Sequence, residues 1–180
     1  MQSLKIYKKP VNHALAAFLF FVTCIGLVLT AFAVNLYELT FVPLSVCLLI
    51  YLVPTLIITP LLLRLIFRQR PKYVVWKCFV ITLSNIIGIG GVLLYVFMAV
   101  NFYDVDASRQ FTQKLSIVST GFRKYSSDKI PYANVRYHNQ LKGFEFPTGG
   151  PPLADFNFLQ MQINHGYFDF DVVKDLKLAK

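Results

Sequence analysis

Acidic residues are nearly absent from the first half of this 180-residue chain. Only Glu38, one of nine Asp and Glu residues in all, lies before residue 101. Charged residues make up 15% of the chain and hydrophobic residues 56%, whereas a soluble domain is about 25% charged. This composition excludes an ordinary soluble domain and predicts an integral membrane protein.

Cysteine is also scarce, and the three residues present, Cys24, Cys47 and Cys78, all lie in apolar runs. The part of the chain after residue 100 therefore has no disulfide to stabilise it, and no Cys-x-x-Cys or Cys/His cluster indicates structural zinc. Gly-x-Ser-x-Gly, His-Glu-x-x-His and Walker A signatures are missing as well. These absences favour a protein without cofactor, metal or enzymatic activity.

Three long apolar runs dominate what is present, and they predict membrane spans over about residues 14–34, 41–63 and 75–100. Each run is long enough to cross ~30 Å of hydrocarbon at about 1.5 Å per residue. None contains Asp, Glu or His, which argues against a complete proton- or ion-coupled carrier. The expected fold is a three-helix transmembrane region, 14–100, followed by a small, mainly β extracytoplasmic domain, 101–180.

A cleaved signal peptide is the alternative interpretation of the first run. Three lysines precede the run, and Ala31-Phe-Ala33 has the form of a cleavage site. The apolar core of a signal peptide is usually about 7–15 residues long, and this run is longer, which favours a span.

Basic residues surround the apolar runs on one side. Residues 1–13 hold three lysines and no acid. The loop 64–74 and the start of the third span hold five more basic residues: Arg64, Arg68, Arg70, Lys72 and Lys77. Because short basic loops stay in the cytoplasm, we expect a cytoplasmic tail and loop, and a C-terminus on the periplasmic or extracellular side of a bacterial inner or plasma membrane.

The net charge of +9 would suggest a nucleic-acid partner if the protein were soluble. Most of the excess flanks the spans, where basic residues set topology and attract anionic lipid headgroups. We therefore expect the lipid bilayer to be a partner and nucleic acid not to be one.

The second predicted span contains Pro54 and Pro60. Each proline removes a backbone hydrogen bond, so we expect helix kinks at both positions. Such a helix either packs against its neighbours or, as a broken helix, lines a site.

The third predicted span contains Ser84, Asn85, Gly88 and Gly91. The spacing of Ser84 and Gly88 predicts close approach of a neighbouring helix or of a partner subunit. Asn85 is the strongly polar residue deepest in a span, and it could instead contact a polar ligand.

Residues 101–180 combine strand and turn signals. We expect a polar exit segment over 101–114, a strand over 115–119 ended by Gly121, and a hairpin whose turn lies within 139–143. Alternation predicts that Val135 and Tyr137 share one face. Further strands are expected at 159–163, with Leu159, Met161 and Ile163 pointing inward, and at 168–172.

Three functions remain open on the sequence alone. The first is a non-enzymatic anchor or accessory subunit whose β domain binds another membrane or periplasmic protein, or a second copy of the chain. Aromatic residues in excess of what one small sheet buries suggest such a surface: Phe144, Phe146, Phe156, Phe158, Tyr167, Phe168 and Phe170. The second is a subunit of a channel or transporter that uses the proline-containing and glycine-rich spans.

The third function is a membrane enzyme with an outer His/Asp site. His138 and His165 are the natural centres of such a site, with Asp155, Asp169 and Asp171 as the nearest acidic partners. Solvated polar residues on strands and turns explain the same pattern without any chemistry.

Overall fold

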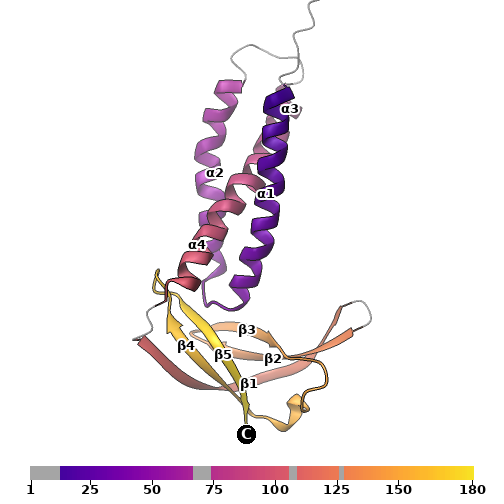
Figure 1. The fold of residues 1–180 in the computed structure, drawn as a ribbon, viewed down its shortest axis with the longest axis vertical. Coiled ribbons are helices and arrows are strands. Elements are labelled where there is room, and N and C mark those ends of the chain that lie inside the picture. The colour runs from indigo at the N-terminus through magenta and orange to yellow at the C-terminus, as the bar shows by residue number, and fades with distance from the viewer. Residues whose placement is uncertain (1–12, 67–73, 106–108, 126–127) are drawn as a thin grey trace, which may run out of the picture.

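The computed structural model describes residues 13–66, 74–105, 109–125 and 128–180. It has three long apolar helical segments followed by a five-stranded antiparallel sheet (Figure 1). The predicted order of helices and then strands is therefore confirmed. Residues 1–12 of the expected tail, and Arg68, Arg70 and Lys72 of the expected loop, lie outside the described residues.

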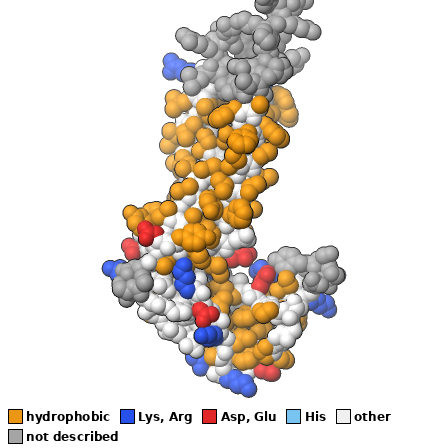
Figure 2. Space-filling model, viewed as in Figure 1, with side chains coloured by type: hydrophobic (Ala, Val, Ile, Leu, Met, Phe, Trp, Pro, Cys, Tyr) orange, Lys and Arg blue, Asp and Glu red, His pale blue; other side chains and the backbone are white. Residues whose placement is uncertain are grey.

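The helical region consists of α1 (His13–Glu38), α2 (Leu44–Ile66) and a third segment made of α3 (Val74–Asn85), a π-helical turn η1 (Ile86–Gly90) and α4 (Gly91–Tyr103). By length and composition, the stretches Ala17–Glu38, Leu44–Arg64 and Val75–Tyr103 could each cross a membrane. Their outward side chains form an apolar belt around the bundle (Figure 2). A belt of this kind needs hydrocarbon rather than water around it.

Two helix boundaries differ from the sequence-based expectation. The first helix continues to Glu38 and takes up most of the expected 35–40 connection, and the third segment extends to Tyr103 rather than ending at residue 100. Hydropathy placed these ends where polar residues begin, whereas the helices continue because the sheet packs against their last turns and covers them.

The sheet has the strand order β3-β2-β1-β4-β5, and all neighbours are antiparallel. Its elements are β1 (Gln110–Tyr125), β2 (Asp128–Tyr137), β3 (Gln140–Glu145), a 3-10 turn η3 (Leu153–Asp155), β4 (Phe158–His165) and β5 (Asp171–Ala179). The long strand β1 pairs with β4 through its first half and with β2 through its second half.

Several strand predictions were wrong. The expected exit segment contains the start of β1, and Gly121 continues that strand rather than ending it. The hairpin turn is His138–Asn139, both with positive φ, so it lies earlier than expected and is a two-residue turn. Residues 166–170 form a turn before β5 instead of a strand. In β1, pairing with distant strands overrode the local turn signals.

The inner face of the sheet forms the core. Leu159, Met161 and Ile163 are fully buried, as predicted, and Val135 and Tyr137 are buried on one face, also as predicted. Phe41, from the turn between α1 and α2, packs into the same cluster. The apolar face of the curved sheet therefore packs mainly on itself, and Phe41 fills the side that faces the helical bundle.

Candidate functional site

The turn between α1 and α2 pairs with the edge of the sheet. The backbone N–H of Phe41 donates to the carbonyl of Asp171 at 2.8 Å, and the N–H of Val173 donates to the carbonyl of Leu39, also at 2.8 Å. Thr40, fully buried, lies opposite Val172 in an isolated antiparallel bridge. Residues 39–41 therefore cover the start of the β5 edge as a short additional strand.

Lys142 of β3 reaches the same turn from the other edge of the sheet. Its side chain is only 9% exposed, and its ammonium group donates to the carbonyls of Tyr37 and Thr40. The Nζ atom lies 4.2 Å from the centroid of the Tyr37 ring. The C-terminal end of α1 has carbonyls without helical partners, and Lys142 satisfies them with a positive charge that also suits the helix dipole.

Burial lowers the pKa of Lys142 from its usual 10.5 to about 8, with attraction from Cys47 and Glu38 opposing the shift. Gln140, two residues earlier, donates to the carbonyl of Phe41 at 3.3 Å. Both edge strands, β3 and β5, thus contact residues 37–41. The curved sheet is closed across its helix-facing side by the α1–α2 turn.

A chain of three side chains lies next to this contact. The Tyr137 hydroxyl donates to Asp171 Oδ2 at 2.7 Å, and His165 Nδ1 lies 2.6 Å from Asp171 Oδ1. Burial, and then the hydrogen bond to Asp171, raise the pKa of Tyr137 above its usual value. Asp171 Oδ2 therefore accepts a hydrogen bond, and Oδ1 is buried with the His165 ring as its close neighbour. This arrangement links β2, β4 and β5 at the position where Phe41 pairs with β5.

Asn101, at the end of α4, holds the β4–β5 turn. Its Nδ2 donates to the carbonyl of Phe170 and its Oδ1 accepts from the N–H of Phe168, both at 3.1 Å, and the side chain is fully buried. A Cβ on Gly166 would lie 2.4 Å from the carbonyl oxygen of Asn101, so only glycine fits there. The ring of Phe97 stacks on Phe168 with a centroid distance of 4.8 Å.

Lys174 adds a contact beside Asn101. Its ammonium group donates to the carbonyl of Phe102 at 2.8 Å and lies 4.0 Å from the centroid of that ring. Burial lowers the pKa of Lys174. We call the combined contacts of residues 37–41 and 97–102 with β3, β5 and the β4–β5 turn the helix–sheet junction.

Inside the bundle, Asn85 contacts α2. Its Nδ2 donates to Thr59 Oγ1 at 2.6 Å and to the Thr55 carbonyl at 3.1 Å, while its Oδ1 is buried without a partner among the described residues. Asn85 is 2% exposed. The sequence predicted a polar group deep in a span, and the structure places that group between two helices, directly before the π-helical turn.

The small residues of the third segment lie against the other helices. A Cβ on Gly88 would lie 2.8 Å from the Val22 side chain, and one on Gly91 would lie 2.2 Å from the Gly26 carbonyl oxygen. Ser84 contributes its carbonyl, which lies 3.4 Å from Thr23 Oγ1. Backbone atoms of α1 and the third segment are therefore in direct contact, an approach that side chains would prevent.

Helix α2 continues through both Pro54 and Pro60 as one helix. Thr55 Oγ1 donates to the carbonyl of Leu52 at 2.7 Å, and Thr59 Oγ1 donates to that of Thr55 at 2.6 Å. These hydroxyls bind carbonyls other than those of Ile50 and Leu56, which are the ones that lose their N–H donors to the two prolines.

The predicted topology residues that the structure describes lie at one end of the bundle. Arg64 is in the last turn of α2 and Lys77 is in the first part of α3. The sheet lies at the opposite end (Figure 1).

The predicted His/Asp residues are only partly brought together. His165 contacts Asp171, whereas Asp169 lies in the preceding turn with a φ of 60°. His138 occupies the β2–β3 turn and packs edge-on against Tyr137, with ring centroids 4.2 Å apart. Asp155 lies in η3. Within the described ranges, no three His, Cys, Asp or Glu side chains form a group that could hold a metal.

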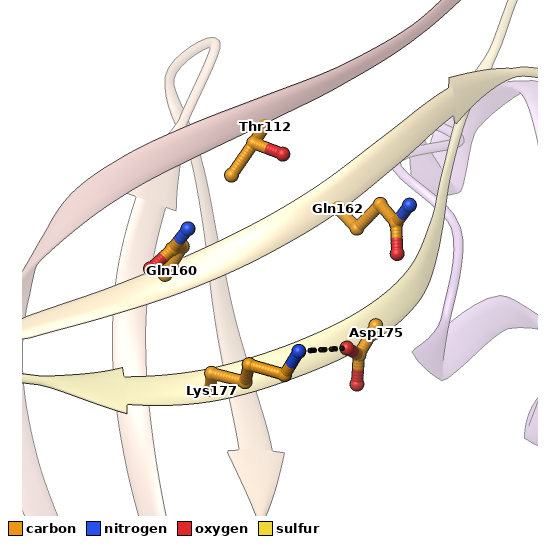
Figure 3. A pocket seen from close by; sticks show the side chains of 5 residues that line it. All are labelled: Thr112, Gln160, Gln162, Asp175 and Lys177. Carbon is orange, nitrogen blue, oxygen red and sulfur yellow. Dashed lines mark ion pairs between the residues drawn. The ribbon is translucent and has the colours of Figure 1, made fainter.

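The sheet surface away from the helices is polar. A shallow hollow on it is lined by Thr112, Gln160, Gln162, Asp175 and Lys177, from β1, β4 and β5 (Figure 3). Lys177 and Asp175 form an ion pair of 3.1 Å along β5, at one side of the hollow. We call these five side chains the outer face.

Comparisons with protein-family models, with curated proteins and with solved structures found no match. Function must therefore be inferred from the geometry.

Sequence reasoning missed three residues of the junction: Tyr137 as a hydrogen-bond donor, Lys142 and Asn101. The alternation of side chains along the strand was a signal for Lys142. Residues two apart share a face, so Lys142 lies on the same apolar face as Phe144 and Phe146. A lysine in that position requires buried acceptors. Asn101 resembled the start of a polar exit segment, and nothing local distinguished it.

Proposed function

We propose that this is a multi-pass membrane protein that acts as a non-enzymatic accessory or anchoring subunit. The N-terminus and the α2–α3 connection would be cytoplasmic, and the sheet would be periplasmic or extracellular. Its role would be to hold the outer face in a set orientation toward another membrane or periplasmic protein, or toward a second copy of the chain. The basic residues at the end of the bundle remote from the sheet support this orientation.

The observation that carries the proposal is the helix–sheet junction. Domains joined by one linker normally move relative to each other unless their interface is large and apolar. Here the α1–α2 turn, the end of α4 and both edge strands are joined by buried hydrogen bonds. A protein that only tethered a binding domain would not need such contacts, whereas one that presents a surface at a fixed height and angle does.

The outer face is the surface we expect to be presented. Its glutamine, threonine and charged side chains offer donors and acceptors to a partner, and polar surfaces of this kind occur in the wet interfaces of non-obligate complexes. The face also points away from the helices, so a partner could reach it without displacing lipid (Figure 3).

In-cell photocrosslinking tests this proposal. A photoreactive amino acid at Gln160 or Gln162 should give one adduct of the same mass, and Lys177→Glu should abolish it. The control position is Leu141, which is 55% exposed on β3, outside the five residues of the outer face. Absence of any adduct from the outer face in protein that is correctly inserted would contradict the proposal.

A second candidate is a subunit of a channel or transporter, favoured by the unpartnered Asn85 Oδ1 beside the π-helical turn. Such turns are frequent at functional sites. In this case Asn85→Leu should abolish transport at unchanged protein levels. Normal transport by this variant would remove the candidate.

A further inference from the structure

The far end of the β1–β2 hairpin extends beyond the strands that flank it. The last residue of β3 that pairs with β2 is Glu145, opposite Tyr132, whereas β1 and β2 remain paired as far as Tyr125 and Asp128. The N–H of Phe146 still donates to the carbonyl of Pro131 at 2.9 Å, and beyond this bond β1 and β2 pair only with each other among the described residues. Residues 122–125 and 128–131 are here called the ribbon end. A two-stranded ribbon has no core and is marginal in water unless something covers it.

The register shows which side chains of the ribbon end face the helices. Phe122 lies opposite Pro131, and Lys124 lies opposite Lys129. Side chains two residues apart share a face, so Pro131 and Lys129 lie on the same side as Ala133, which is fully buried. This is the inner side of the sheet, which turns toward the helical bundle.

The inner side of the ribbon end is both apolar and positively charged. Phe122 is 69% exposed, and Lys124 and Lys129 are exposed as well. Like charges directly opposite each other in a sheet are destabilising, and neither lysine has an ion pair within the part of the chain that the structure describes. The nearby Glu145 pairs with Arg123 at 2.9 Å on the other side of the ribbon.

The curvature of the sheet carries this end toward the helices. A shift of register between Ile117 and Ser119 marks a β-bulge, and bulges bend strands and increase their twist. In Figure 1, where the longest axis is vertical, the free end of the hairpin rises to about the level of the α1–α2 turn. That turn is where the apolar belt of the bundle ends (Figure 2).

We propose that the ribbon end rests on the anionic headgroup layer of the membrane that the helices cross. Phe122 would enter the interface, and Lys124 and Lys129 would bind lipid phosphates. An anionic surface removes the repulsion between the two lysines and is attracted by both. The inference rests on the proposed membrane insertion, and it adds a second, electrostatic contact between sheet and lipid.

Fluorescence quenching by lipids tests this contact. The chain has one tryptophan, Trp76, so Phe122→Trp in a Trp76→Phe background gives a single probe in the full-length protein. The vesicles are phosphatidylcholine alone or phosphatidylcholine mixed with phosphatidylglycerol, each with a quencher near the headgroups. We expect strong quenching in the anionic vesicles. Lys124→Gln with Lys129→Gln should shift the ratio of docked to undocked ribbon roughly 30-fold toward undocked, at about 1 kcal/mol per lysine.

Two controls complete the experiment. Lys114→Gln with Lys177→Gln removes the same charge from the opposite side of the sheet and should leave quenching unchanged, and a probe at Gln160 on the outer face should stay unquenched. If the ribbon probe is unquenched while Trp76 of the unaltered chain is quenched, only the ribbon proposal fails. If Trp76 is unquenched too, the proposed membrane insertion fails. Quenching that is equal in both vesicles or insensitive to the lysines would overturn the electrostatic contact.

Discussion

The two buried asparagines of the third helical segment contrast the interior of the bundle with the helix–sheet junction. Asn85 uses its amide nitrogen twice and has no partner for Oδ1 in the part of the chain that the structure describes, whereas Asn101 uses both its nitrogen and its oxygen. In the bundle, each helix satisfies its own backbone groups, so the hydrogen bonds of a polar side chain come in addition to a backbone that is already paired. At the junction, Asn101 supplies the acceptor for the Phe168 N–H and a second donor for the Phe170 carbonyl, beside the bonds that the turn 166–170 makes within itself.

The same contrast extends to packing. The bundle brings backbones together through glycines at positions such as Gly26 and Gly91. The junction instead uses long side chains, with Lys142 and Lys174 crossing from the sheet to helix carbonyls. Three changes test whether the two regions differ in the way described, and they are ordered from the largest expected effect.

Replacing Gly91 by leucine should have the largest effect. A Cβ there would lie 2.2 Å from the Gly26 carbonyl oxygen, a backbone atom that cannot move aside, so α1 and α4 must separate. We expect the free energy of unfolding in mixed micelles to fall by at least about 3 kcal/mol. Gly150→Ala is the control, since its Cβ would lie 3.4 Å from the nearest atom. Equal stability of the two variants would show that the close helix contact is not needed.

The two asparagines can be compared directly through leucine variants. Asn101→Leu leaves the Phe168 N–H unpaired and takes one of two donors from the Phe170 carbonyl, which keeps the N–H of Gly166; together these losses should cost about 3 kcal/mol. Asn85→Leu removes hydrogen bonds between helices that already satisfy their own backbones, and such bonds average about 0.6 kcal/mol. Unfolding followed by denaturant titration measures both. A larger loss for Asn85→Leu would reverse the comparison.

The lowered pKa of Lys142 predicts that the stability of the folded protein depends on pH. Its pKa is about 8 in the folded protein and 10.5 when exposed, so between these values the unfolded chain binds more protons and stability rises with pH. Below about pH 8 both states are protonated and the contribution is constant. We expect the folded protein to gain about 3 kcal/mol across this window relative to Lys142→Met. Parallel pH profiles for the two proteins would contradict the assignment.

Part of the fold was predictable because it follows from local composition. Long apolar runs required helices in hydrocarbon, and alternation placed Leu159, Met161 and Ile163 inside a sheet. The strand limits were not predictable, because β1 continues through Gly121 by pairing with two different neighbours. The candidate site was least predictable: three aspartates were possible partners of His165, the folded chain brings Asp171 to it, and Lys142 was not expected to be buried.

The sequence alone determined that three apolar helices precede a small antiparallel sheet, because hydrophobic length and period-two alternation are properties of consecutive residues. Only the tertiary structure decided how the two parts are joined. Lys142, Asn101 and Asp171 acquire their roles from residues about 70 to 130 positions away. No local pattern encodes a helix end that receives its hydrogen-bond donor from a distant strand, because that pairing exists only once the chain has folded.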